Sequence, residues 1–125
     1  MTTHLPVHHV ILLAHGSSTP TWAAPFRQLQ VLLQTDNTPV HLAFISSQSP
    51  TLPQAAADAI AAGAKQVTVL PALLGAGVHA LEDIGRDVAA LHAAYPAVTF
   101  TVAPVLGANE AVLEAIATAL RPWLT

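Results

Sequence analysis

The sequence predicts an α/β fold with a single doubly wound, four-stranded parallel sheet in the order 2-1-3-4 and helices on both faces. Strand-like apolar runs alternate four times with segments of helical periodicity, and the connections between them are short. The run Val10–Leu13 is continuously apolar, which is typical of a strand buried on both faces of a parallel sheet. These two observations predict a parallel sheet that helices cover on both faces.

The first half of the chain supplies two strand–helix pairs. A strand over residues 7–14 precedes a helix expected over about 21–34, with Pro20 near its start and Thr19 or Thr21 as its cap. Val40–Ile45 is the second expected strand. It leads into an alanine-rich helix that opens at Leu52-Pro53-Gln54 and ends at Gly63.

The second half repeats the pattern. A third strand is expected over Val67–Leu74, and its Pro71 is compatible with this sheet only where pairing is ending. A helix over about 80–94 carries apolar residues at helical spacing: Leu81, Ile84, Val88 and Leu91. The fourth strand covers Val98–Ala103, and Asn109 can cap a final helix.

Composition limits the classes of function. A length of 125 residues predicts one domain over residues 1–125, and 53% hydrophobic against 9% charged residues favours an oligomer that hides apolar surface. A net charge of -3 with four basic residues argues against nucleic-acid or membrane partners. The absence of cysteine, of a signal peptide and of a long apolar run makes a cytoplasmic location the expectation.

Two histidines follow strands that are neighbours in this sheet order. His15 follows the first strand and His79 follows the third, so both are expected at the crevice outside the carboxyl ends of the strands. Two neutral imidazoles can bind a divalent ion such as Co²⁺, Ni²⁺, Fe²⁺ or Zn²⁺ with open coordination positions. That openness suits catalysis or metal delivery better than a closed structural site.

The residues beside these histidines permit two interpretations each. Ser17 and Ser18 are either hydrogen-bond donors to a ligand or turn residues. Glu82 and Asp83 lie one helical turn from His79, where they either orient it and complete the metal shell or simply favour the start of a helix.

Two long segments then resemble a known family. LLAHGSSTPTWAAPFRQL and SPTLPQAAADAIAAGAKQVTVLPALLGAGVHALEDI are similar to the short sirohydrochlorin cobaltochelatases of the CbiX type. The similarity includes a first strand ending in His-Gly-Ser, a Pro-x-Leu-Pro-x-Ala-like helix start, and a later loop that ends in His. It extends over about residues 9–105.

The resemblance implies a chelatase-like fold and an ATP-independent lyase activity that inserts a divalent metal, Co²⁺ first, into the tetrapyrrole sirohydrochlorin for cobalamin- or sirohaem-type cofactors. It implies a homodimer and no organic cofactor. His15 and His79 would bind the metal, and His15 would also accept pyrrole protons. The macrocycle pocket would be lined by the segment between the third strand and His79: Leu73, Leu74, Gly75, Ala76, Gly77 and Val78.

Two positions depart from the family pattern. Ser46 stands where many relatives have glutamate, and Ser18 stands where arginine is common. Ser46 and Gln48 can still donate hydrogen bonds to a substrate carboxylate. The competing hypotheses are a metal- or tetrapyrrole-binding module of this fold that has lost turnover, and an interaction domain without metal.

Overall fold

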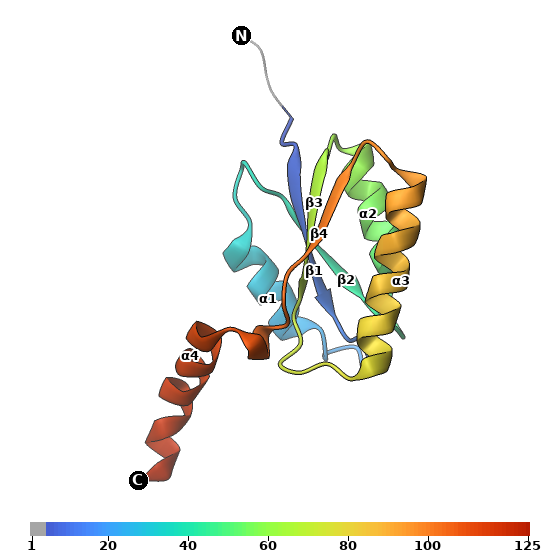
Figure 1. The fold of residues 1–125 in the computed structure, drawn as a ribbon. Coiled ribbons are helices and arrows are strands. Elements are labelled where there is room, and N and C mark those ends of the chain that lie inside the picture. Colours follow the sequence, from blue (N-terminus) through green and yellow to red (C-terminus); the bar gives the residue numbers. More distant parts are fainter. Residues whose placement is uncertain (1–4) are drawn as a thin grey trace.

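The sheet of the computed structural model, which describes residues 5–125, has four parallel strands in the order β2-β1-β3-β4 (Figure 1). The predicted order is therefore confirmed. Residues 1–4, on which part of the signal-peptide argument rests, lie outside the described residues. The strands are β1 (His8–Ala14), β2 (Val40–Phe44), β3 (Gln66–Pro71) and β4 (Thr99–Val102).

Strand β1 occupies the centre of the sheet. It pairs with β2 on one side and β3 on the other, so that Leu12 lies opposite Leu42 and Leu70. Every residue of β1 after His8 is buried, as expected for a strand covered on both faces. Pro71 is the last paired residue of β3, opposite Leu13, so its missing N–H interrupts no further ladder.

Helices cover the two faces unequally. Alternate residues of the strands divide the interior into two clusters. Ile11 and Val69 belong to the cluster under α2 (Leu52–Ala61) and α3 (Val78–Ala94). Leu12 belongs to the cluster under α1 (Ala24–Leu33), which is the helix that covers the opposite face.

The helix starts test the capping residues that the sequence predicted. Thr51 and Gln54 form a reciprocal capping box at α2, and the Asn109 side chain accepts a hydrogen bond from the Ala111 N–H at α4, as predicted for that cap. The expectation for the first helix was wrong in detail. It begins at Ala24 rather than near residue 21, and its cap residue Ala23 makes no side-chain hydrogen bond, so neither Thr19 nor Thr21 caps it.

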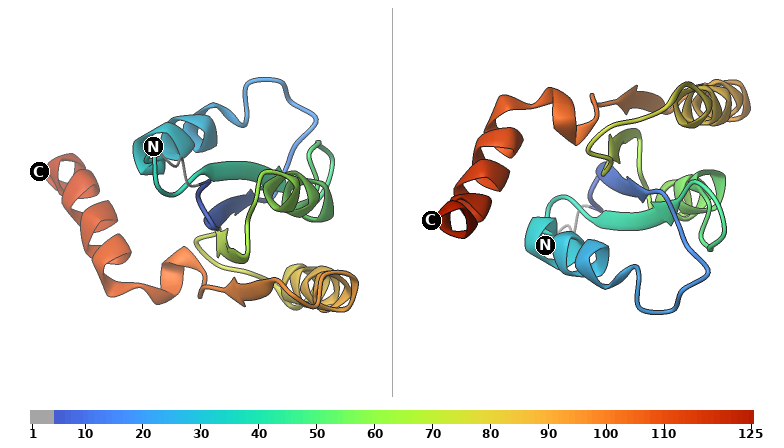
Figure 2. Two further views of the ribbon diagram at one scale, coloured as in Figure 1. Left: turned by 90° about the horizontal axis from the view of Figure 1, so that it is seen from above. Right: turned by 90° about the horizontal axis from the view of Figure 1, so that it is seen from below.

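Helix α4 (Glu110–Leu120) stands apart from the sheet. It follows the short 3₁₀ turn η1 (Leu106–Ala108) and continues into η2 (Arg121–Leu124), and both views in Figure 2 show it extending away from the other elements. None of its residues is buried within the described chain. Within residues 5–125, no helix combines the length and apolar character that crossing a membrane requires.

Candidate functional site

His15 lies directly after β1, in a backbone held by the end of β2. The Ser46 N–H donates to the His15 carbonyl at 3.0 Å, and the Ile45 N–H donates to the Ala14 carbonyl at 2.9 Å. Gly16 has a φ of 102°, and a β-carbon there would collide with the Ser46 carbonyl oxygen. The His15 side chain is exposed while its backbone is fixed, an arrangement that suits a ligand-binding residue.

Ser17 takes part in the turn that follows. Its hydroxyl oxygen accepts a hydrogen bond from the Thr19 N–H at 3.0 Å, and its own N–H donates to Gln48 Oε1 at 3.0 Å. Ser17 is therefore a turn residue through its hydroxyl oxygen, and its hydroxyl proton can still donate a hydrogen bond to a ligand. Gln48 is already engaged by the turn, and Ser46 is exposed beside it.

The loop before His79 is anchored by hydrogen bonds at its start and has free space at its two glycines. The Ala72 N–H donates to the Leu13 carbonyl at 2.7 Å, and the Leu106 N–H donates to the Leu73 carbonyl at 2.9 Å. A β-carbon on Gly75 or on Gly77 would meet no described atom within 4 Å. Packing inside this chain therefore does not require these two glycines, and they leave free space next to the histidine.

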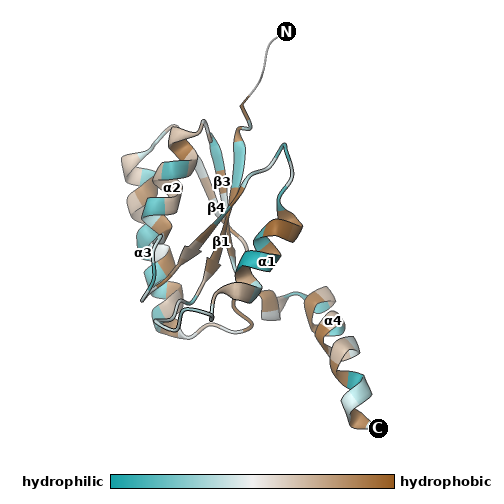
Figure 3. Cartoon of the chain, turned by 180° about the vertical axis from the view of Figure 1, so that it is seen from behind, coloured by the Kyte–Doolittle hydropathy of each residue, from teal (hydrophilic) through white to brown (hydrophobic). Residues whose placement is uncertain are grey.

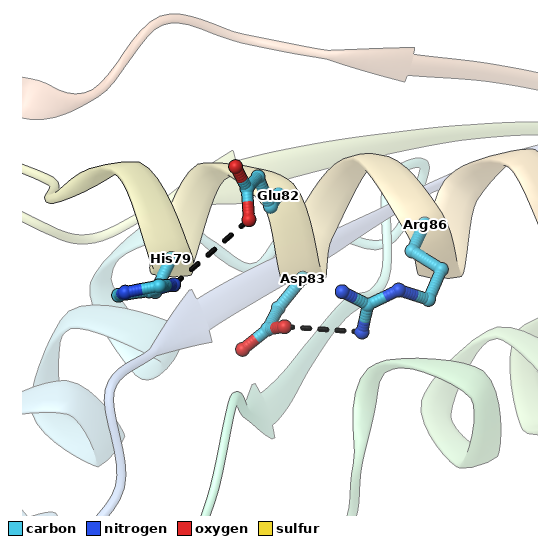
Figure 4. Close-up of polar contacts among 4 residues, drawn as sticks. All are labelled: His79, Glu82, Asp83 and Arg86. Atoms are coloured by element: carbon cyan, nitrogen blue, oxygen red, sulfur yellow. Dashed lines mark hydrogen bonds and ion pairs between the residues drawn. The ribbon is translucent and has the colours of Figure 1, made fainter.

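His79 is the second residue of α3, and its side chain is 99% exposed. Its Nδ1 lies 3.9 Å from Glu82 Oε2, which is within ion-pair range but too long for a hydrogen bond (Figure 4). Asp83 instead pairs with Arg86, Oδ1 to Nη1, at 3.1 Å. Of the two predicted acids, Glu82 is thus the one near the His79 ring.

The loops that carry His15 and His79 lie at the same edge of the sheet, the lower edge in Figure 1. This edge holds the carboxyl ends of β1 and β3, as the strand order predicted. Within residues 5–125, no group of three or more His, Cys, Asp or Glu side chains is arranged to hold a metal ion. A metal here would take its remaining ligands from substrate, water or a second chain.

Exposed apolar residues lie near His79 in the sequence. Leu74, Val78 and Leu81 are all more than half exposed. Periodicity counted Leu81 with the buried residues of α3, but the structure buries Ile84 and leaves Leu81 in solvent. Spacing alone does not separate them, since Leu81 lies three residues from exposed Val78 and three from buried Ile84.

A second histidine pair lies at the opposite end of the sheet. His9 is 2% exposed, its Nε2 donates to the Pro6 carbonyl at 3.1 Å, and its Nδ1 accepts from His41 Nε2 at 2.9 Å. Burial, reinforced by His9, lowers the pKa of His41, and Asp58 opposes that shift. These hydrogen bonds give the pair a role within the fold.

Comparison with known proteins agrees with this fold. The chain is 32% identical over 77 residues to sirohydrochlorin cobaltochelatase from Saccharolobus islandicus (strain L.S.2.15 / Lassen #1), covering 62% of this chain and 60% of that protein. It is 33% identical over 79 residues to sirohydrochlorin cobaltochelatase from Methanocaldococcus jannaschii, covering 62% and 55%. The match thus spans less than two thirds of the length of these relatives.

Solved structures extend the similarity to nearly the whole chain. A CbiX protein from Marinobacter aquaeolei VT8, itself assigned only provisionally to cobalamin biosynthesis, superimposes with a TM-score of 0.79 at 31% identity, covering 94% of this chain and 97% of that one. The sirohydrochlorin chelatase SirB from Bacillus subtilis subspecies spizizenii, solved with cobalt, shares the fold with a TM-score of 0.77 at 23% identity, covering 92% and 50%.

The family model described as CbiX matches residues 9–122, a span that includes both loops of the site. With the His-Gly-Ser strand end and the His79 loop at one sheet edge, this match makes the chain a member of the CbiX family.

Proposed function

We propose that this chain inserts a divalent metal, with Co²⁺ the favoured ion, into sirohydrochlorin without ATP. The observation that carries the proposal is the position of His15 and His79, on exposed loops at one edge of the sheet, in a member of a family whose relatives are named sirohydrochlorin cobaltochelatase. Ni²⁺ and Fe²⁺ are the other candidate ions, since imidazole ligands suit all three. The active form is a homodimer in the cytoplasm.

The residues of the site supply the two operations that metallation needs. The imidazoles of His15 and His79 would replace water on the incoming ion and leave coordination positions for the pyrrole nitrogens. Pyrrole N–H protons must leave as the metal enters, and His15 accepts them when its ring is not ligating. A single nitrogen cannot ligate and accept a proton at once, so these two roles of His15 follow one another.

The surface around His79 suits a flat macrocycle. Exposed Leu74, Val78 and Leu81 offer apolar contact to a ring face, and the free space at Gly75 and Gly77 admits the ring close to the backbone. Glu82, 3.9 Å from His79, orients the ring or receives its proton. Ser17 and Ser46 donate hydrogen bonds to substrate carboxylates at the other loop.

The absorbance change of sirohydrochlorin with Co²⁺ tests the activity directly. We expect the protein to accelerate the change, and we expect His15→Ala and His79→Ala each to return the rate to the uncatalysed one. His92→Ala, an exposed histidine near the other end of α3, is the matched control and keeps the acceleration. Wild-type protein with no acceleration would exclude the chelatase assignment.

Two observations favour a second function. Ser46 occupies the edge of the site where a carboxylate would assist proton removal, and the described residues place no third metal-binding side chain with the histidines. A binding module would hold Co²⁺ or sirohydrochlorin without accelerating their reaction. In that case Ser46→Glu, at an exposed position, is the variant expected to introduce turnover.

A further inference from the structure

The loop after β2 contacts the loop that carries His15 at three successive residues. The Ser46 N–H donates to the His15 carbonyl at 3.0 Å, and the Ser46 carbonyl oxygen lies against Gly16. Gln48 Oε1 then accepts a hydrogen bond from the Ser17 N–H, also at 3.0 Å. Strands β1 and β2 both end in apolar residues and pass into more hydrophilic loops at this edge of the sheet (Figure 3). The second loop therefore supports the first one residue by residue.

Ser47, between these two contacts, has an unusual backbone. Its φ is 65°, and within residues 5–125 it is the one residue other than glycine with a positive φ. The β-carbon makes this conformation uncommon, and it persists only where the surroundings hold it. The loop is closed on its far side by the Phe44 N–H, which donates to the Pro50 carbonyl at 2.9 Å. The turn at Ser47 lets both of its neighbours face the loop that carries His15.

The bond to Ser17 determines which way the Gln48 amide points. A backbone N–H can only donate, so the amide oxygen must face Ser17. The amide NH₂ group then points in another direction, and the hydrogen bonds described for Gln48 engage its oxygen alone. The Gln48 side chain is half-buried beside exposed Ser46. Its NH₂ group is thus held in a fixed orientation next to the site, where it can donate to a carboxylate.

We propose that the Gln48 amide has two functions: Oε1 positions the loop that carries His15, and the NH₂ group binds a side-chain carboxylate of the tetrapyrrole. The inference rests on the proposed function, whose substrate carries carboxylates around the periphery of its ring. With four Lys and Arg residues in the sequence, a fixed neutral donor adds to the few cations available for such a substrate. Because one planar amide makes both contacts, binding of the carboxylate is coupled to the placement of His15.

Two variants separate the two ends of the amide. Gln48→Glu keeps an oxygen that accepts from the Ser17 N–H, but it replaces the donor with a second carboxylate oxygen that repels substrate carboxylates. Gln48→Met has a similar length and neither group. Gln54→Glu is the matched control, because Gln54 Oε1 also accepts from a backbone N–H, that of Thr51 at 2.9 Å, and the change adds the same charge on the first turn of α2.

Amide hydrogen exchange at Ser17 measures the positioning function without metal or substrate. The Ser17 N–H should be protected in the wild-type protein and in Gln48→Glu, and it should exchange about tenfold faster in Gln48→Met, which loses the bond. The Ser46 N–H, bonded to the His15 carbonyl, should stay protected in all three proteins and reports that the loops remain folded. Equally fast exchange at Ser17 in all three proteins would overturn the positioning function.

Equilibrium titration with metal-free sirohydrochlorin measures the binding of the carboxylate. Salt at about 0.15 M limits the reach of an added charge to roughly 8 Å. Under these conditions Gln48→Glu should weaken binding about tenfold, the size of one hydrogen bond to a charged group. Gln54→Glu should bind like the wild-type protein. No weakening in Gln48→Glu, or equal weakening in both glutamate variants, would overturn the role of the NH₂ group.

Metallation kinetics with Co²⁺ test whether the two functions act on the reaction differently. Gln48→Glu should raise KM with kcat little changed, whereas Gln48→Met should also lower kcat on the order of tenfold, because His15 is less well placed. A wild-type kcat in Gln48→Met would overturn the positioning function. A wild-type protein that gives the expected exchange and binding results without accelerating metallation would instead contradict the chelatase proposal and leave both contacts of Gln48 standing.

Discussion

The two ends of the sheet use histidine in opposite ways. At the amino end, His9 and His41 bond to each other and His9 bonds to the Pro6 carbonyl, so the His9 nitrogens are both satisfied inside the chain. At the carboxyl end, His15 and His79 are exposed, and the hydrogen bonds described for their loops do not involve the two rings. The first pair therefore contributes to the stability of the fold, whereas the packing of residues 5–125 does not depend on the rings of the second pair.

The glycines at the carboxyl end give the largest contrast in stability. Gly16→Ala should destabilise the protein by about 3 kcal/mol or more, because the new methyl group meets the Ser46 carbonyl at a backbone angle that favours glycine. Gly75→Ala meets nothing and should leave stability equal or raised by up to roughly 1 kcal/mol. Urea unfolding measures the free energy of unfolding of both variants. Equal losses of stability in the two variants would contradict the packing described at Gly16.

His9→Ala should have the next largest effect. The change opens a cavity among buried residues and leaves the Pro6 carbonyl and the His41 donor without their partner, which together cost about 2–4 kcal/mol. The free energy of unfolding from denaturant titration measures the loss. His8→Ala, one residue earlier and only partly buried, is the comparison variant and should lose clearly less.

The amino-end pair should also make stability depend on pH. Burial and His9 lower the folded-state pKa of His41, so the unfolded chain binds more protons as acid is added. The stabilisation is complete above the unfolded pKa of about 6.5 and is lost as pH falls through it toward the folded value. The unfolding midpoint should therefore decrease as the pH is lowered from 7.5 to 5. His41→Gln should make the midpoint depend less on pH over this range. An unchanged slope would assign the effect to another group.

The smallest stability effect belongs to the carboxyl-end pair. His15→Ala and His79→Ala remove exposed rings, so the unfolding midpoint should not move. The same variants should abolish the rise in midpoint that excess Co²⁺ gives the wild-type protein, because ligand binding to the folded state alone raises its stability. Retained Co²⁺ protection in both variants would place the metal elsewhere on the chain.

Local patterns predicted the features that depend on local physics. The sheet order followed from alternating strands and helices with short connections, and the Asn109 cap followed from its residue type. The same reasoning misplaced the start of α1, since Thr19 and Thr21 lie in a turn held by other bonds. The choice of Asp83 to pair with Arg86, leaving Glu82 near His79, depends on side-chain rotamers that spacing does not specify.

Other features depend on what surrounds a residue. Periodicity places Leu81 on an apolar helix, but only the position of α3 on the sheet decides that this leucine faces solvent near His79. In the same way, the pattern of α4 predicts that one face will be buried without saying against which surface. Such questions require the three-dimensional arrangement.

The open space at Gly75 and Gly77 has an evolutionary consequence. Most loops that shape a ligand surface also support the fold, so changing the ligand preference of the protein costs stability. Here an alanine at either glycine adds a methyl group in the loop before His79 without meeting a described atom. The surface beside His79 can therefore change in one step, whereas Gly16, the residue directly after His15, has no comparable freedom.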